Sequence, residues 1–264
     1  MAGMTPQNYY KQCRARRRKE VEEGLLLELV CRERGLQPRL GVRKLLKLLE
    51  EDFSEAGIEI GRDRFFELLR RHELLIERRV CSVRTTYSGH RLPVYGNLLK
   101  EKTLTGVGQA ILSDITYVRT EEGFLYLSLI SDGYSRAIVG HDCSDTLEVE
   151  GALRALDQAL CQLVSGKGTI HHSDRGSQYC CREYVGRLRG AGVAVSMTEE
   201  SHCYENAQAE RLNGILKQEY GLGRTFRTKS EALAAVEEAV WLYNYRRPHA
   251  SLGYAIPMEV HRAA

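Results

Sequence analysis

Three acidic residues lie within or beside apolar segments, where an isolated carboxylate is costly. Asp114 interrupts the apolar run AILSDITYV, Asp174 follows the segment TIHH, and Glu210 falls in the helical segment YENAQAERLNGILKQEY (204–220). A charge in such surroundings must be neutralised by a partner. Clustered carboxylates repel one another, and they are stable together only when they are protonated or share cations.

An all-oxygen site of this kind suits Mg²⁺, with Mn²⁺ as a substitute, because these hard cations are completed by water and substrate phosphate. Two such ions roughly 4 Å apart can stabilise the attacking and leaving oxygens of an in-line phosphoryl displacement. Each acid alone could equally be a surface or helix-capping carboxylate. The prediction therefore depends on a fold that brings Asp114, Asp174 and Glu210 together.

The two histidines in TIHHSDRGSQY (169–179) do not form a zinc site with Asp174. Neighbouring side chains of a strand point to opposite faces, so His171 and His172 cannot both reach one metal. His172 shares the face of Asp174 and is expected to support it, whereas His171 is expected to pack against the other side of the sheet. Asn206 lies four residues before Glu210 on the same helix face and is expected to support that acid.

The elements that must position these acids can be read from the periodicity of the apolar residues. Segments 109–118, 124–132 and 136–145 are rich in Ile, Val, Leu and Tyr and predict a three-stranded antiparallel meander. Residues 146–164 predict a helix, and further strands and helices alternate after it. The order βββαβαβα predicts an α/β fold with a mixed five-stranded sheet flanked by helices. Trp241, at helical spacing with Val236 and Val240, is expected in the core.

The N-terminal part instead predicts a small all-α domain. Helical spacing of apolar residues appears in 19–35, in 41–53 and in 62–74. The last two predicted helices are joined by a Gly-containing turn, and the second carries Arg62, Arg64, Arg70 and Arg71. This arrangement is typical of a helix-turn-helix that binds DNA, although a helical bundle with a solvated arginine face fits equally well.

The charge distribution agrees with a division of the chain into domains. Residues 1–102 carry 22 Lys and Arg against 15 Asp and Glu, whereas the remainder carries 16 against 20. A basic arm beside an acidic domain suggests a polyanionic partner. We expect a helical DNA-binding region (1–77), a basic linker (78–106) that follows a DNA backbone, and a catalytic core (107–264).

Composition excludes several other classes of protein. The sequence contains no apolar run of about 18 residues, as a membrane span requires, and its N-terminus lacks the apolar region of a secretory signal. The eight cysteines include no CxxC pair and no regular framework, which favours reduced thiols in a cytoplasmic protein.

Several long motifs make the C-terminal part similar to a known family. SDITYV, SDGYSRAIVG, HHSDRGSQY, SMTEESHCYENAQAERLNGILKQEYGL and YNYRRPHASLGY resemble the ribonuclease-H-like integrase core of bacterial insertion-sequence transposases. The resemblance covers about residues 105–264. The segment GVRKLLKLL to RFFELLRRHELL is a weaker match to the helix-turn-helix that often precedes this core.

The resemblance implies a DDE transposase whose catalytic and metal-binding triad is Asp114, Asp174 and Glu210, with two Mg²⁺ ions as cofactors. Its substrate would be double-stranded DNA at the terminal inverted repeats of the element. Lys217 would contact DNA near the acids, and the C-terminal motif would add contacts from Arg247 and His249. The chain departs from the family pattern at Ile111, His141 and Glu205 without losing an acid of the triad.

The resemblance also implies partners. Two transposon ends must be held together, which suggests a homo-oligomer on DNA, and relatives often act as fusions with the product of an upstream reading frame. The protein would then work in the bacterial cytoplasm, at the nucleoid when bound to DNA. Two alternatives stay open: a nuclease of the same fold that cuts without joining, and a non-catalytic DNA-binding regulator of transposition.

Overall fold

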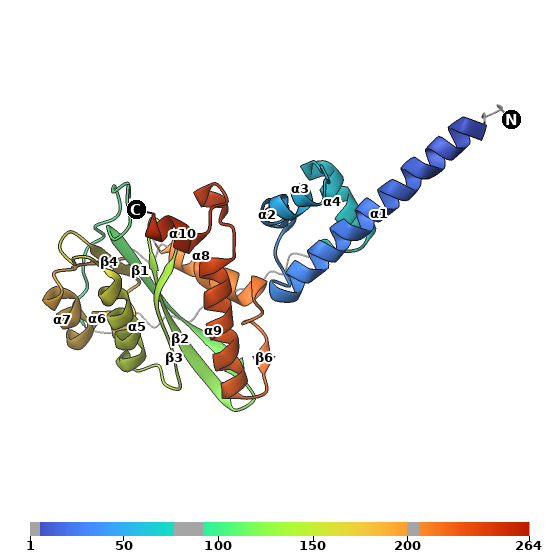
Figure 1. Ribbon diagram of the computed structural model, residues 1–264. Coiled ribbons are helices and arrows are strands. Elements are labelled where there is room, and N and C mark those ends of the chain that lie inside the picture. Colours follow the sequence, from blue (N-terminus) through green and yellow to red (C-terminus); the bar gives the residue numbers. More distant parts are fainter. Residues whose placement is uncertain (1–5, 77–91, 200–205, 264) are drawn as a thin grey trace. The chain divides into compact units, whose positions relative to one another are not determined.

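The computed structural model describes residues 6–76, 92–199 and 206–263. The chain divides into two compact units, Met1–Arg78 and Arg79–Ala264, which are described separately (Figure 1). None of the helices in the described ranges is long and apolar enough to span a lipid bilayer.

The first unit is entirely helical, as predicted. Its helices are α1 (Pro6–Leu36), α2 (Val42–Leu48), α3 (Glu50–Glu55) and α4 (Arg62–Arg71). Apolar residues of all four helices, among them Leu26, Leu45, Phe53 and Phe65, form one buried cluster. The predicted helix 41–53 is divided at Leu49, whose backbone leaves helical geometry with φ −95° and ψ 8°.

The first helix is longer than the apolar pattern predicts. α1 begins at Pro6 rather than near residue 19, and its residues 7–21 are exposed. Only the part of α1 that begins near Leu26 contributes to the buried cluster. The N-terminal half has no apolar stripe, so periodicity gave no sign of it.

The second unit contains a mixed sheet. Its strands are β1 (Ala110–Thr120), β2 (Gly123–Asp132), β3 (Ile138–Ser144), β4 (Ile170–Ser173), β5 (Ala194–Met197) and β6 (Thr225–Phe226). The order is β3-β2-β1-β4-β5, with β6 beside β1. The first three strands form the predicted antiparallel meander, and β4 and β5 add to it in parallel. The two-residue β6, parallel to β1, was not predicted.

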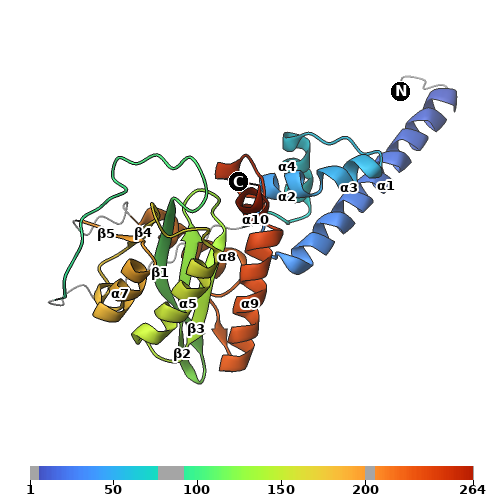
Figure 2. The same ribbon diagram turned by 60° about the vertical axis from the view of Figure 1, so that its left-hand side comes forward.

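Helices cover both faces of this sheet (Figures 1 and 2). They are α5 (Val149–Gln162), α6 (Ser177–Cys180), α7 (Arg182–Gly190), α8 (Ala207–Glu219), α9 (Lys229–Tyr245), the 3-10 turn η1 (Ala250–Leu252) and α10 (Pro257–Arg262). Residues of α5 and α7 form one buried cluster with the sheet, and residues of α8 and α9 form a second. The segment after β4 forms two consecutive helices, α6 and α7, which Cys181 separates.

The packing of α5 on the sheet depends on a glycine. A Cβ atom added to Gly140 of β3 would lie 2.1 Å from the carbonyl oxygen of Ala155. Side chains are therefore excluded at this position because the helix backbone approaches the strand backbone closely.

Two expectations about this unit were wrong. Trp241 has 55% of its surface exposed, although Val236 and Val240 on the same helix are buried. Part of the predicted linker is attached to the sheet: the Leu98 amide donates to the Ser196 hydroxyl at 2.9 Å, and the Met197 amide donates to the Gly96 carbonyl. Residues 92–106 thus belong to the second unit, and residues 78–91 of the linker lie outside the described residues.

Candidate active site

The acid Asp114 lies in the middle of β1, a strand paired with neighbours on both sides. Its side chain is half-buried. One carboxylate oxygen accepts a hydrogen bond from the Asn213 amide at 2.6 Å, and the other accepts from the Ile115 backbone amide at 2.9 Å. These donors fix the orientation of the carboxylate without adding a positive charge.

The acid Asp174 directly follows β4, the parallel neighbour of β1. The register pairs Ala110 with Ile170 and Leu112 with His172. Continued by two residues, this register sets Asp174 beside Asp114, and adjacent strands are only about 4.8 Å apart. The Asp174 carboxylate also accepts a hydrogen bond from the Gly176 amide at 2.9 Å, which holds it in the turn after the strand.

The acid Glu210 lies in the first turn of α8. Two asparagines on the same helix attach α8 to β1. Asn206, at the helix start, donates to the Ser113 carbonyl at 3.3 Å, and Asn213 donates to Asp114. Glu210 lies between these two attachments along the helix, so its carboxylate is carried to the edge of the Asp114 site.

The three carboxylates influence one another electrostatically. Burial and the charge of Asp174 raise the pKa of Asp114 from 3.8 to about 7, and Glu210 adds a smaller effect in the same direction. Burial and then Asp174 raise the pKa of Glu210. Each acid disfavours ionisation of another, which is the situation that a bound cation relieves.

The chemistry of these donors fits a hard divalent cation, but the arrangement is not a closed cage. Within the described ranges, no three His, Cys, Asp or Glu residues surround a common metal position. The nearest pair, Asp114 and Asp174, offers carboxylate oxygens from adjacent strands. The amide oxygens of Asn206 and Asn213 are buried and have no hydrogen-bond partner in the part of the chain that the structure describes. Such acceptors suit the water molecules that Mg²⁺ usually keeps.

The two histidines have separate environments, as strand alternation predicts. The His171 ring nitrogen Nε2 is bonded to the Ser113 hydroxyl at 2.7 Å and to the Tyr184 hydroxyl at 2.9 Å. Burial, and then His172, lower the pKa of His171 to about 3, so this ring stays neutral in the core. His172 is buried and bonded through Nδ1 to the Ser196 hydroxyl at 2.8 Å. Its predicted support of Asp174 stays a prediction.

The residues of the second unit that were expected to contact DNA, Lys217, Arg247 and His249, differ in their burial and contacts. The Lys217 ammonium lies 4.4 Å from the centre of the Tyr117 ring, on the helix that carries Glu210. Arg247 corrects the expectation, because its side chain is buried and forms a two-pronged ion pair with Glu219 at 2.8 and 3.0 Å. The guanidinium is therefore buried and paired within the fold, and its Nη1 has no hydrogen-bond partner in the part of the chain that the structure describes. His249 is half-buried beside the Tyr243 ring.

The arginines expected to contact DNA in the first unit lie on the exposed surface of α4. Arg62 pairs with Asp63, Arg70 with Glu67, and Arg71 with Glu23 of α1. The fourth, Arg64, is also exposed. Phe66 of the same helix is 39% exposed, and Arg70 lies over its ring.

One site residue was not assigned a role from the sequence. Asn213 donates the shortest hydrogen bond to Asp114, yet the helical spacing indicated only that it shares a face with Glu210. The missing signal is the packing of α8 on β1, which the spacing within one helix does not contain. Glu205, a departure from the family pattern, lies outside the described residues.

The chain matches known proteins over nearly its full length. Two models described as integrase core domain match residues 105–203 and 191–257. An insertion element IS600 uncharacterized 31 kDa protein of Shigella sonnei is 35% identical over 97% of this chain and 94% of the relative. The transposase for insertion sequence element IS629 of the same species is 33% identical over 84% of this chain and 74% of the relative.

A solved structure supports the fold. A simian T-cell lymphotropic virus intasome contains a chain that superimposes with a TM-score of 0.52 at 15% identity, over 78% of this chain and 68% of that one. At this identity the likeness concerns the fold alone, and it confirms the predicted ribonuclease-H-like architecture.

Proposed function

The chain belongs to the bacterial insertion-sequence transposases with an integrase core domain, which act in DNA transposition, and we propose that Asp114, Asp174 and Glu210 form its catalytic centre. Membership of this family makes it an enzyme that cuts and joins DNA. The identity of the acids, the metal mechanism and the DNA substrate are the proposal.

The observation that carries the proposal is the mutual effect of the three carboxylates. They come from β1, from the turn after β4 and from α8; burial raises the pKa of Asp114 to about 7, and the charges of Asp174 and, to a lesser extent, Glu210 act in the same direction. Two divalent cations, Mg²⁺ or in its place Mn²⁺, would supply activation of the attacking oxygen and stabilisation of the leaving oxygen when bound by these acids. The carboxylates would hold these cations, and their positions would determine where the attacking and leaving oxygens lie.

The other residues orient these acids. Asn213 holds one oxygen of Asp114, and the backbone amide of Ile115 holds the other. Asn206 anchors the start of α8 on β1, so that Glu210 stays beside the pair of aspartates. Lys217, two turns further along the same helix face, would contact a DNA phosphate next to the cut. His172 would support the strand end that carries Asp174.

The reaction consists of two phosphoryl displacements at one site. Water attacks first, breaks the phosphodiester bond at the transposon end and releases a 3′-hydroxyl there. This hydroxyl then attacks a phosphate of the target DNA, forms a new phosphodiester bond and displaces the 3′-hydroxyl of the cut target strand. No covalent bond between protein and DNA is needed. The substrate is double-stranded DNA with the terminal inverted repeats of the element, held by a homo-oligomer in the bacterial cytoplasm at the nucleoid. A fusion with the product of an upstream reading frame would supply further contacts.

The test is a strand-cleavage and strand-transfer assay on labelled duplexes taken from the DNA that flanks this reading frame, with Mg²⁺. We expect nicked and joined products from the wild type and none from Asp174→Asn. Asp145→Asn, which removes an exposed carboxylate outside the site, is the matched control and should retain both activities. Nicking without joining would favour the nuclease. DNA binding without any metal-dependent reaction, even with the upstream product added, would favour the regulator.

A further inference from the structure

The N-terminal half of α1 extends beyond the core of its own unit. Residues 7–21 are exposed, and the buried cluster of this unit includes α1 residues only from Leu26 onward. Fifteen helical residues span about 22 Å. A helix without an apolar stripe that faces a core either bridges domains through solvent or is stabilised by ion pairs one turn apart.

This exposed half carries a concentrated positive charge. The nine residues KQCRARRRK (11–19) include six Lys and Arg and no acidic residue. Arg16 and Arg18 form ion pairs with Glu20 and Glu22, one turn further along the helix. Within the described ranges, Lys11, Arg14 and Arg17 form no ion pair with the protein.

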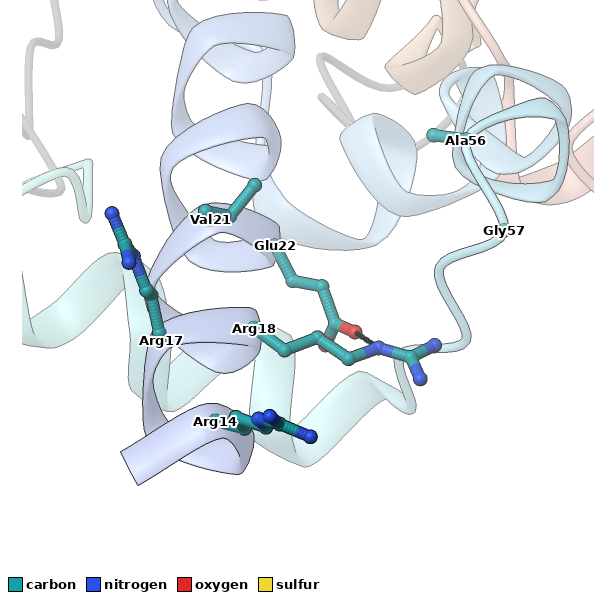
Figure 3. A pocket seen from close by; sticks show the side chains of 7 residues that line it. All are labelled: Arg14, Arg17, Arg18, Val21, Glu22, Ala56 and Gly57. Carbon is teal, nitrogen blue, oxygen red and sulfur yellow. Dashed lines mark hydrogen bonds and ion pairs between the residues drawn. The ribbon is translucent and has the colours of Figure 1, made fainter. Parts of the chain in front are cut away.

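Three of the basic residues share a face of the helix, and this face borders a hollow. In helical geometry, residues 11, 14, 18 and 21 follow one another along one side. A hollow of about 420 Å³ lies where this side meets the turn after α3, and its lining includes Arg14, Arg17 and Arg18. Figure 3 shows the side chains of Arg14 and Arg18 extending in the same direction, with Glu22 bonded to Arg18.

The opposite wall of the hollow is formed by residues with little or no side chain. It consists of Ala56 and Gly57, and Gly57 has a φ of +67°. This positive φ favours glycine, so the wall carries no large side chain that would close the hollow. The single acid in the lining, Glu22, is already paired, and the hollow therefore remains positively charged.

The chemistry of this hollow selects an anion with several oxygens. Guanidinium groups bind phosphate through paired N–H donors, and they do so more directionally than ammonium groups. The seven residue steps from Lys11 to Arg18 span about 10 Å, the rise of roughly three nucleotides along one strand of B-DNA. The length of this basic face of α1 therefore matches the spacing of several successive phosphates in DNA. A small anion would not require a basic face of this length.

Net charge and ion pairing make α4 less suitable than α1 as the main contact with the DNA backbone. The nine basic-rich residues of α1 have a net charge of +6, whereas α4 (RDRFFELLRR) has a net charge of +2. Three of the four α4 arginines are already paired with carboxylates. The helix that the sequence pattern favoured for DNA contact is thus the less positive of the two.

We propose that the basic face of α1, with the hollow beside Gly57, binds the phosphate backbone of double-stranded DNA without regard to base sequence. The proposal rests on the proposed function in that DNA is the substrate. It assigns to α1 the electrostatic part of DNA binding and leaves any reading of base sequence to α4.

The experiment compares two triple variants of the full chain that remove equal charge. One is Arg14→Gln/Arg17→Gln/Arg18→Gln, and the matched control is Arg62→Gln/Arg64→Gln/Arg70→Gln. Fluorescence anisotropy with labelled duplexes of inverted-repeat and scrambled sequence gives the affinity between 50 and 300 mM salt, a range chosen because each phosphate contact contributes about 0.9 to the slope of log K against log salt. Circular dichroism verifies that both variants keep the helical content of the wild type.

We expect the α1 variant to lose affinity equally for both duplexes and to reduce the salt slope by about 2 to 3. The α4 variant should change the slope less. An α1 variant with the wild-type slope, or an α4 variant with an equal reduction, would overturn the proposal. So would a loss of oligomer mass in light scattering with unchanged DNA binding, which would make α1 a protein–protein element.

Strand cleavage by the wild type, measured in parallel, separates this proposal from the proposed function. Cleavage together with an unchanged salt slope in the α1 variant would refute only the role of α1. A reduced slope without cleavage by the wild type would refute the catalytic assignment and leave the role of α1 supported.

Discussion

Replacing Asp114 by Asn should stabilise the metal-free protein at neutral and alkaline pH. The carboxyl group lies half-buried in the middle of β1, and burial together with Asp174 raises its pKa from 3.8 to about 7. Folding therefore forces an ionised carboxylate into an unfavourable place whenever the pH is high. An amide of nearly the same shape has no proton to lose and escapes this penalty.

The sign and size follow from proton linkage. Because the folded protein binds the proton of Asp114 more tightly than the unfolded chain, the contribution is fully present below pH 4 and is lost as the pH rises through 7. A shift of about three pKa units corresponds to about 4 kcal/mol, which is an upper limit because partial exposure to solvent weakens the effect. At pH 8 we expect Asp114→Asn to have the higher free energy of unfolding by up to this amount, and at pH 4 no such advantage.

The measurement is urea denaturation between pH 4 and 8.5 in the presence of a chelator, with Asp145→Asn as a control. Asp145 lies on the surface, and its variant should follow the pH profile of the wild type. Excess Mg²⁺ or Mn²⁺ should then restore the wild type at pH 8 and leave Asp114→Asn unchanged, since a bound cation offsets the repulsion. Parallel profiles for the wild type and Asp114→Asn would refute the account of the site given above.

Two further changes test the packing around the site. Arg247→Met should lower the free energy of unfolding in urea by about 3 kcal/mol, because it leaves Glu219 with an uncompensated charge in the interior; weaker DNA binding at unchanged stability would instead restore Arg247 as a DNA contact. Gly140→Ala should lower it by roughly 2 kcal/mol or more, because the new Cβ meets the Ala155 carbonyl, whereas Gly186→Ala on exposed α7 should raise it by about 0.5 to 1 kcal/mol. Equal effects of the two glycine changes would contradict the close approach of β3 and α5.

Much of the second unit could be predicted from the sequence because its elements are long and their apolar residues are periodic. The meander of β1, β2 and β3 repeats every two residues and is punctuated by turns. Asp114 was recognisable because a charge interrupts an apolar strand, and Asp174 because polar residues end another. Both signals are local, which explains why they needed no knowledge of the tertiary structure.

The features that could not be predicted from the sequence depend mainly on contacts between distant segments. Arg247 belongs to a basic, exposed-looking motif, but its partner Glu219 is 28 residues away and draws it into the interior. Trp241 is next to a buried Val240, yet one residue along a helix turns the side chain by about 100° and directs it to solvent. The strand β6 has only two residues, too few to show a period.

The exposed half of α1 could not be predicted from the sequence for the opposite reason, because it has no packing at all. Its residues were not recognised as helix because sequence reading depends on apolar spacing, and this segment has none. Opposite charges four residues apart, as in Arg16 and Glu20, were the available sign. Ion pairs one turn apart can stabilise a helix without a core-facing stripe, and this segment contains two of them.

The energetics of the acid site point the same way. A fold selected for stability alone would not keep Asp114 beside Asp174 on adjacent strands, because replacing either by an amide removes the repulsion and keeps the shape. The asparagines of α8 do not remove the repulsion between the two aspartates, because Asn213 donates a hydrogen bond without bringing a positive charge. In the described structure the repulsion that raises the pKa of Asp114 is thus held in place by β-sheet pairing and helix packing. Under the proposed function, such a site is prepared for divalent cations, and these cations would hold the reacting phosphate of DNA beside the acids.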